Sequence, residues 1–177
     1  DNMGIEGATE DEGVTASRLR RAKAMLATLL FARGVPMILA GDEFGNSQNG
    51  NNNAYCQDND IGWLDWENAN DDLTQAVASM TALRREHRAL RARNFAGSTG
   101  VVAQDWTEVA WLRSDGEPMA EADWDDEGAA FCLHLSSQAQ EVVIVIAGRD
   151  DATITLAQGP WTFRFGTDAS VRFDEEA

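Results

Sequence analysis

The chain has few cysteines, few basic residues and no long apolar stretch. Only Cys56 and Cys132 occur in 177 residues, too few for a disulfide scaffold, so we expect reduced thiols in a cytoplasmic protein. No run of about 18 apolar residues occurs, and we expect no membrane-spanning helix. With 30 acidic and 14 basic residues the formal net charge is −16. That excess argues against nucleic acid and against an anionic membrane surface as partners.

The acidic excess is unevenly distributed along the chain. Residues 1–94 carry 14 acidic and 10 basic residues, whereas residues 95–177 carry 16 and 4. The spacing of apolar residues changes at the same place, from three and four to strict alternation. We therefore predict two domains, 1–94 and 95–177.

Residues 17–33 and 71–93 are each predicted to form an amphipathic helix, because their apolar residues recur at spacings of three and four. Asn70 is the expected N-cap of the second helix. Basic residues lie near the start of the first, where the helix dipole disfavours them, so tertiary contacts must compensate. Arg18, Arg21 and Lys23 make up this group.

Val35–Ala40 is a continuous apolar run between glycines, typical of a strand buried on both faces of a parallel sheet. One parallel strand cannot satisfy its own backbone groups and needs a neighbour on each side. Helix, strand, charged loop and helix in this order are typical of the end of a (β/α)8 barrel. A strand that lacks its neighbours exposes its edges. We therefore expect the chain to self-associate, or residues 1–94 to rearrange.

Residues 44–70 form a long loop rich in Asn, Gly and Asp. A loop of this length in a compact domain is usually functional or disordered. The aromatic residues Tyr55, Trp63 and Trp66 argue against disorder, because such side chains need surfaces to pack on. We therefore expect a functional loop.

Residues 95–177 are predicted to form an antiparallel β-sandwich. Apolar and polar residues alternate in several short segments separated by turns, which is typical of such folds. The expected strands lie at 131–136, 142–147, 153–156 and 161–165, with Val171 and Phe173 in a last one. The predicted fold class is thus α+β: a helix–strand–helix remnant of a barrel, followed by an all-β sandwich.

The stretch Arg33–Trp66, RGVPMILAGDEFGNSQNGNNNAYCQDNDIGWLDW, closely resembles the eighth-strand region of isoamylase-type bacterial glycogen debranching enzymes of the α-amylase clan, glycoside hydrolase family 13. The run GNNNAYCQDN is long and unusual in composition, whereas GVPxxxAGDE alone would indicate only the wider clan. Ile5–Gly7 resembles the end of the stretch after the seventh strand. Trp111–Gly116, Met119 and Asp123–Trp124 resemble the C-terminal domain. The resemblance covers essentially the whole chain, but only the C-terminal quarter or so of a family member.

This resemblance implies hydrolysis of α-1,6-glucosidic branch points of glycogen or limit dextrin, with retention of configuration. The family uses an Asp nucleophile, a Glu acid/base and a second Asp, which follow the fourth, fifth and seventh barrel strands. No residue of this chain matches those motifs, so we expect the fragment to be inactive. We assign no catalytic residue, metal ligand or cofactor, and we expect a branched α-glucan as the partner of the parent enzyme.

Asp42 and Glu43 are candidate substrate-binding residues. Neighbouring residues of a strand point to opposite faces, whereas a retaining pair needs its carboxyl groups about 5 Å apart across one bond. A catalytic pair is therefore not expected. Contact with the substrate cleft and capping of loop amides remain equally open.

Asn51, Asn52, Asn53 and Tyr55 are further candidates, because amides hydrogen-bond to hydroxyl groups and an aromatic ring stacks on a pyranose. The alternative is a network of turns that shapes the loop. Trp63 is either a sugar platform or a residue packed beneath the loop. Two other functions also stay open: a non-catalytic glucan-binding or structural module, and another enzyme of the clan, either trehalose-releasing or transglycosylating.

Overall fold

The computed structural model describes residues 2–92, 108–126, 128–137, 140–146 and 151–167. The chain divides into two compact units, one within the ranges Asp1–Ala32, Pro36–Leu83 and Phe163–Ala177, the other within Arg33–Val35 and Arg84–Thr162. The predicted domain boundary near residue 95 lies outside the described residues and stays a prediction. Neither of the two long helices has a stretch apolar enough to cross a bilayer.

Helix α1 spans Glu12–Phe31 and starts earlier than predicted. The cause is Asp11, whose carboxylate accepts a hydrogen bond of 2.9 Å from the Val14 amide and so caps the first turn. Tertiary contacts were expected to offset the unfavourable position of the basic residues near the start of this helix, and Arg18 and Lys23 make such contacts. Arg18 donates to backbone carbonyls of the preceding loop, and Lys23 Nζ lies 2.8 Å from Asp72 Oδ1.

Helix α2 spans Asp71–Glu86. Its N-cap is Asn70, as predicted, because the Asn70 Oδ1 atom accepts a bond of 2.9 Å from the Leu73 amide. The helix ends well before residue 93, since His87 is extended and the chain continues as the 3₁₀ turn η3, Arg88–Arg91. The Arg91 guanidinium donates to the carbonyls of Arg84 and Arg85, each at 2.9 Å. These bonds satisfy two carbonyls that the end of a helix leaves without a partner.

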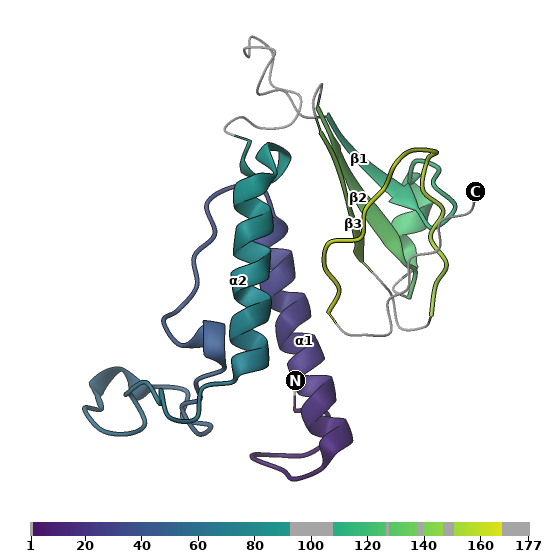
Figure 1. The fold of residues 1–177 in the computed structure, drawn as a ribbon. Coiled ribbons are helices and arrows are strands. Elements are labelled where there is room, and N and C mark those ends of the chain that lie inside the picture. Colours follow the sequence, from purple (N-terminus) through teal and green to yellow (C-terminus); the bar gives the residue numbers. More distant parts are fainter. Residues whose placement is uncertain (1, 93–107, 127, 138–139, 147–150, 168–177) are drawn as a thin grey trace. The chain divides into compact units, whose positions relative to one another are not determined.

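Helices α1 and α2 lie side by side and run in the same direction (Figure 1). Their contact is a small core centred on Met80, which is completely buried. The buried members are Leu30, Ala76, Val77 and Met80, and the half-buried residues packed on them are Leu26, Ala27, Phe31 and Phe165.

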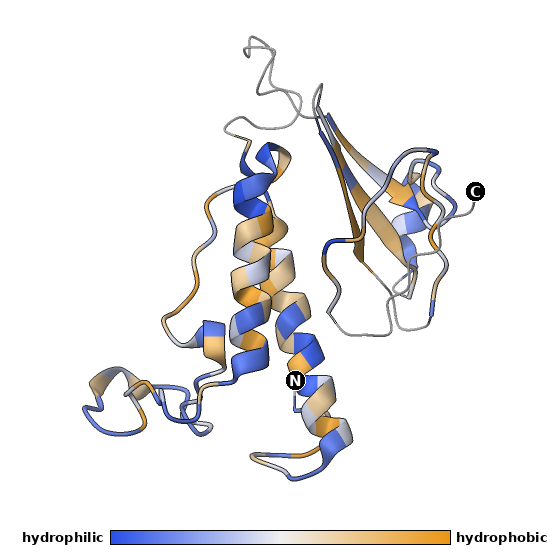
Figure 2. Ribbon diagram, viewed as in Figure 1, coloured by the Kyte–Doolittle hydropathy of each residue, from blue (hydrophilic) through white to orange (hydrophobic). Residues whose placement is uncertain are grey.

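The predicted strand at 35–40 is wrong, because Val35–Leu39 is irregular. Its apolar side chains are also not buried: Val35 is 92% exposed and Met37 is 83% exposed. Figure 2 shows most of this segment in the orange of hydrophobic residues, with a short pale blue interruption. The physical reason is that a strand needs hydrogen-bond partners, and the only sheet among the described residues is β1-β2-β3, which does not include it.

The sheet is antiparallel and three-stranded, with β1 (Glu108–Arg113), β2 (Phe131–Ser136) and β3 (Glu141–Ile146) in that order. The strand predicted at 131–136 is confirmed. The one predicted at 142–147 is found at 141–146, and residue 147 lies outside the described residues, while β1 was not predicted. Residues 153–156 and 161–165 form no strand. These segments make isolated hydrogen bonds in place of a strand ladder. The Thr155 amide donates to the Ser114 carbonyl at 2.8 Å, and Trp161 Nε1 donates to the Ala157 carbonyl at 2.7 Å. Val171 and Phe173 lie outside the described residues.

The two helices and the open antiparallel sheet confirm an α+β composition. The sheet buries Cys132 and Leu135, which lie three residues apart on β2 and therefore face opposite sides of the sheet. Burial raises the pKa of the Cys132 thiol, which disfavours its reactive thiolate form. Cys56, in contrast, is exposed.

Candidate functional site

A half-open cavity of about 400 Å³ lies at the start of the long loop. It is lined by Leu39, Ala40, Gly41, Asp42, Asn46, Ser47 and Gln48. Asp42 is the one candidate from the sequence that lines it. The polar groups offered here are a carboxylate, two amides and a hydroxyl, which both donate to and accept from a neutral hydroxylated ligand.

Gly41 sets the shape of this cavity. It has φ +105°, which L side chains rarely adopt, and a Cβ atom there would lie 2.7 Å from Asn46 Cβ. Its carbonyl accepts from the amides of Phe44 and Asn46, at 3.1 and 3.0 Å. A glycine is therefore required for the chain to turn sharply and bring Asn46 back over the backbone.

Asp42 and Glu43 lie not at a strand end but at the start of a 3₁₀ turn, η1 (Asp42–Phe44). Asp42 Oδ2 accepts from the Leu39 amide at 3.2 Å, and Glu43 Oε2 accepts from the Gly41 amide at 2.8 Å. The expectation that they face opposite sides of a strand is therefore wrong, because these residues are not part of a strand. Of the two open interpretations, capping of loop amides is the one for which these bonds give direct support.

The two ends of the loop are joined by three contacts. The Asn46 side chain accepts from the Asp65 amide at 2.9 Å, the rings of Phe44 and Trp66 are 4.6 Å apart, and the Asn70 amide donates to the Phe44 carbonyl at 2.9 Å. Hydrogen bonds from Asn68 also lower the pKa of the Asp65 carboxyl. These contacts join residues 44–46 to residues 65–70, so the two ends of the loop are held together.

The other sequence candidates lie further along this loop, around a second 3₁₀ turn, η2 (Ala54–Cys56). Asn51 Oδ1 accepts from the Asn53 amide at 2.9 Å, as expected for the turn-network interpretation. Trp63 Nε1 donates to Asp58 Oδ1 at 2.9 Å, although the Trp63 side chain is largely exposed. Asn52 is exposed, and Tyr55 is 98% exposed.

The hydrogen bonds of the described residues divide five of the seven candidates into two groups. Asp42 and Glu43 bond within the cavity segment, whereas Asn51, Asn53 and Trp63 bond within residues 51–63. The sequence did not single out Asn46, Ser47 or Gln48 as cavity residues. Their only signal was membership of the Asn-rich loop, which does not distinguish a lining residue from its neighbours. In the described part of the chain, no three His, Cys, Asp or Glu side chains converge as a metal site would require.

The amino-acid sequence of the chain is similar to those of several known bacterial proteins. No protein-family model matches it. Three bacterial proteins named "Glycogen debranching enzyme" are similar to it: one from Klebsiella pneumoniae, 40% identical over 164 residues; one from Enterobacter sp. (strain 638), 39% over 164; and one from Pectobacterium carotovorum, 38% over 178.

These alignments cover 90%, 90% and 98% of this chain, but only 23%, 23% and 24% of the relatives. The chain therefore spans about a quarter of the length of the curated relatives it matches. The resemblance stated from the loop and sheet motifs is confirmed. Over nearly all of its own length, this chain is a homologue of the bacterial glycogen debranching enzymes.

Proposed function

We propose that this chain is part of a longer cytoplasmic hydrolase that cleaves α-1,6-glucosidic branch points of glycogen or limit dextrin with retention of configuration. The observation that carries the proposal is the identity of 36–40% to bacterial proteins named for glycogen debranching. This similarity extends over 90–98% of the chain. Because the relatives are about four times longer, the activity belongs to the longer protein.

In this proposal the 177 residues alone do not catalyse the reaction. The catalytic Asp, Glu and Asp that the resemblance implies would precede residue 1. Asp42 and Glu43 accept hydrogen bonds from the Leu39 and Gly41 amides, which supports a structural role for these two carboxylates. These two residues would instead fix the floor of a substrate cleft.

Residues 1–94 would form the end of a (β/α)8 barrel in the longer protein. Two features support this. Helices α1 and α2 run in the same direction. The apolar segment Pro36–Leu39, which leads from the end of α1 to the long loop before α2, runs in the opposite direction (Figure 1). A strand between two helices of a barrel follows this path. Residues 95–177 would form a sandwich, since β2 carries apolar residues on both faces of the sheet.

The long loop would line the glucan cleft through Asp42, Glu43, Asn51, Asn52, Asn53, Tyr55 and Trp63. Tyr55 is the strongest of these, because a phenol ring that is almost fully exposed on an anchored loop is available for stacking on a pyranose. The asparagine amides supply both donors and acceptors for sugar hydroxyl groups. A negatively charged ligand is disfavoured by the acidic character of the chain.

The test is hydrolysis by the longer protein that contains this chain. Reducing ends are counted after incubation with branched limit dextrin and, as the control, with linear maltoheptaose, and the anomer released first is identified by NMR. We expect release from the branched substrate alone, as the α-anomer. Release of trehalose, transfer between linear chains, or no reaction with the branched substrate would contradict the proposal.

A further inference from the structure

One face of the three-stranded sheet carries a group of aromatic side chains that the proposed cleft does not use. In the register of the sheet, Trp111 pairs with Leu133 and Arg113 pairs with Phe131. Directly opposed residues of an antiparallel pair share a face. Trp111, Arg113 and Phe131 therefore lie on the same side of the sheet.

Trp124, from the 3₁₀ turn η4 (Glu121–Asp125), completes this group. The ring centres of Trp111, Trp124 and Phe131 lie 5.5–5.9 Å from one another, at interplanar angles of 60–80°. Edge-to-face and tilted contacts of this kind are favourable arrangements of aromatic rings. Yet Trp111 remains 39% exposed and Trp124 49% exposed. The two indoles thus contact each other and Phe131 while part of each ring remains open to solvent.

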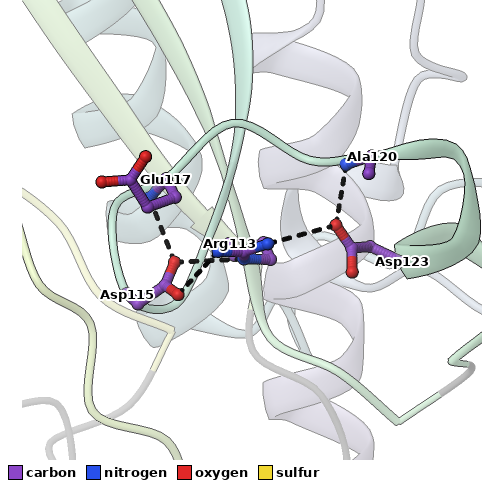
Figure 3. Close-up of polar contacts among 5 residues, drawn as sticks. All are labelled: Arg113, Asp115, Glu117, Ala120 and Asp123. Carbon is purple, nitrogen blue, oxygen red and sulfur yellow. Dashed lines mark hydrogen bonds and ion pairs between the residues drawn. The ribbon is translucent and has the colours of Figure 1, made fainter.

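Charged groups in fixed orientations lie beside these rings. Figure 3 shows Arg113 between Asp115 and Asp123. Asp115 accepts from Arg113 at 2.9 and 3.2 Å and from the Glu117 amide at 3.0 Å. Asp123 Oδ2 lies 3.8 Å from Arg113 NH1 and accepts from the Ala120 amide at 2.7 Å. All three side chains remain partly exposed.

We propose that Trp111, Trp124 and the Arg113–Asp115–Asp123 group form a binding surface for a linear segment of α-glucan. An indole offers an apolar face to the C–H face of a pyranose, and the planar charged groups beside it donate to and accept from hydroxyl groups. Because each group is already held by its neighbours, little conformational entropy is lost on binding. The choice of an α-glucan as ligand rests on the proposed function.

The charge of this region favours a neutral polymer. Residues 95–177 carry 16 acidic and only 4 basic residues, so a polyanion would be repelled. The one cation of the group, Arg113, is already neutralised by Asp115 and Asp123. This leaves hydroxyl recognition and ring stacking as the chemistry that the surface offers.

The experiment measures maltoheptaose binding to the full 177-residue chain by isothermal titration calorimetry. Trp124→Ala removes an exposed ring, and we expect at least a tenfold loss of affinity. Trp124→Phe keeps a stacking ring, and we expect a loss of less than about threefold. The matched control is Phe163→Ala, which removes an aromatic ring of similar exposure outside the group and is expected to leave affinity unchanged. Near-ultraviolet circular dichroism verifies that each variant is folded.

Several results would overturn the inference. These are no binding by the unsubstituted chain, equal binding of cellohexaose, and a loss caused by Tyr55→Ala but not by Trp124→Ala, since the last would assign binding to the long loop. Failure of the proposed function is distinguishable from these. A longer protein that binds through Trp124 but releases no reducing ends contradicts the hydrolase alone, whereas hydrolysis without Trp124-dependent binding contradicts this surface alone.

Discussion

Single charged side chains organise parts of this chain that have no regular structure. Arg18 gathers the irregular residues 2–7 by donating to the carbonyls of Asn2, Ile5 and Gly7. Arg91 does the same at the end of α2. In both places the guanidinium has several donors in a fixed fork, which a lysine cannot reproduce.

Replacement of Arg18 tests this role. We expect Arg18→Ala to lower the free energy of unfolding by about 1–2 kcal/mol, because charged hydrogen bonds contribute about 1.5–3 kcal/mol each and less where water competes. Arg18→Lys should be nearly as destabilised, since it keeps the charge but loses the fork. Urea unfolding followed by circular dichroism measures both. Wild-type stability of Arg18→Lys would mean that charge alone matters.

The Arg113–Asp115 pair predicts a pH dependence. Hydrogen bonding to Arg113, and then to the Glu117 amide, lowers the pKa of Asp115 below its ordinary value of 3.8. A carboxyl with a lowered pKa in the folded state stabilises the fold above its unfolded pKa, and this contribution disappears as pH falls through the folded pKa. The Tm difference between wild type and Asp115→Asn should therefore be largest near neutral pH and should shrink as the pH falls below 3.8 and through the lowered pKa of Asp115. A difference that is constant with pH would contradict this.

At the scale of elements, the helices were predictable and the strands only partly so. The stripe that contains Val77 and Met80, and the cap Asn70, are local signals, and both were correct. Val35–Leu39 has the composition of a buried strand, but strand formation depends on a partner that its own sequence does not encode. Strand β1 was missed because Arg113 occupies the apolar side of its alternation. Cavity residues such as Asn46 could not be identified from sequence either, because the turn at Gly41 that brings Asn46 into the cavity is not visible in the local pattern.

The packing of α1 on α2 makes a prediction about stability. Met80 is completely buried between the helices, whereas its neighbour Thr81 is exposed. We expect Met80→Ala to reduce the free energy of unfolding by about 2–5 kcal/mol through lost burial and the cavity left behind. Thr81→Ala, the matched control, should change it by less than about 0.5 kcal/mol. Equal effects in urea unfolding would mean that the helices do not pack as described.

At the scale of the whole molecule, the exposed apolar segment is the most consequential feature. Val35, Met37 and Leu39 are largely exposed in a segment without a partner strand among the described residues. An exposed apolar segment with unpaired backbone groups promotes association. In the longer protein, neighbouring barrel strands would cover it.

We therefore expect the isolated chain to self-associate in sedimentation velocity experiments. Met37→Lys should shift it toward monomer, because a charge in the contact opposes pairing, whereas Thr81→Lys, on the exposed side of α2, should not. A strictly monomeric wild-type chain in which the amides of residues 35–40 are protected from hydrogen exchange would contradict this prediction.

The proposal that the chain contributes the loop, but not the catalytic groups, of a debranching hydrolase is tested most directly by one comparison. Reducing ends released from branched limit dextrin are counted for the isolated chain and for the longer protein at equal molar concentration. We expect the longer protein to be active and the isolated chain to give no release above background. Hydrolysis by the isolated chain would contradict the proposal and would make Asp42 and Glu43 the catalytic carboxylates.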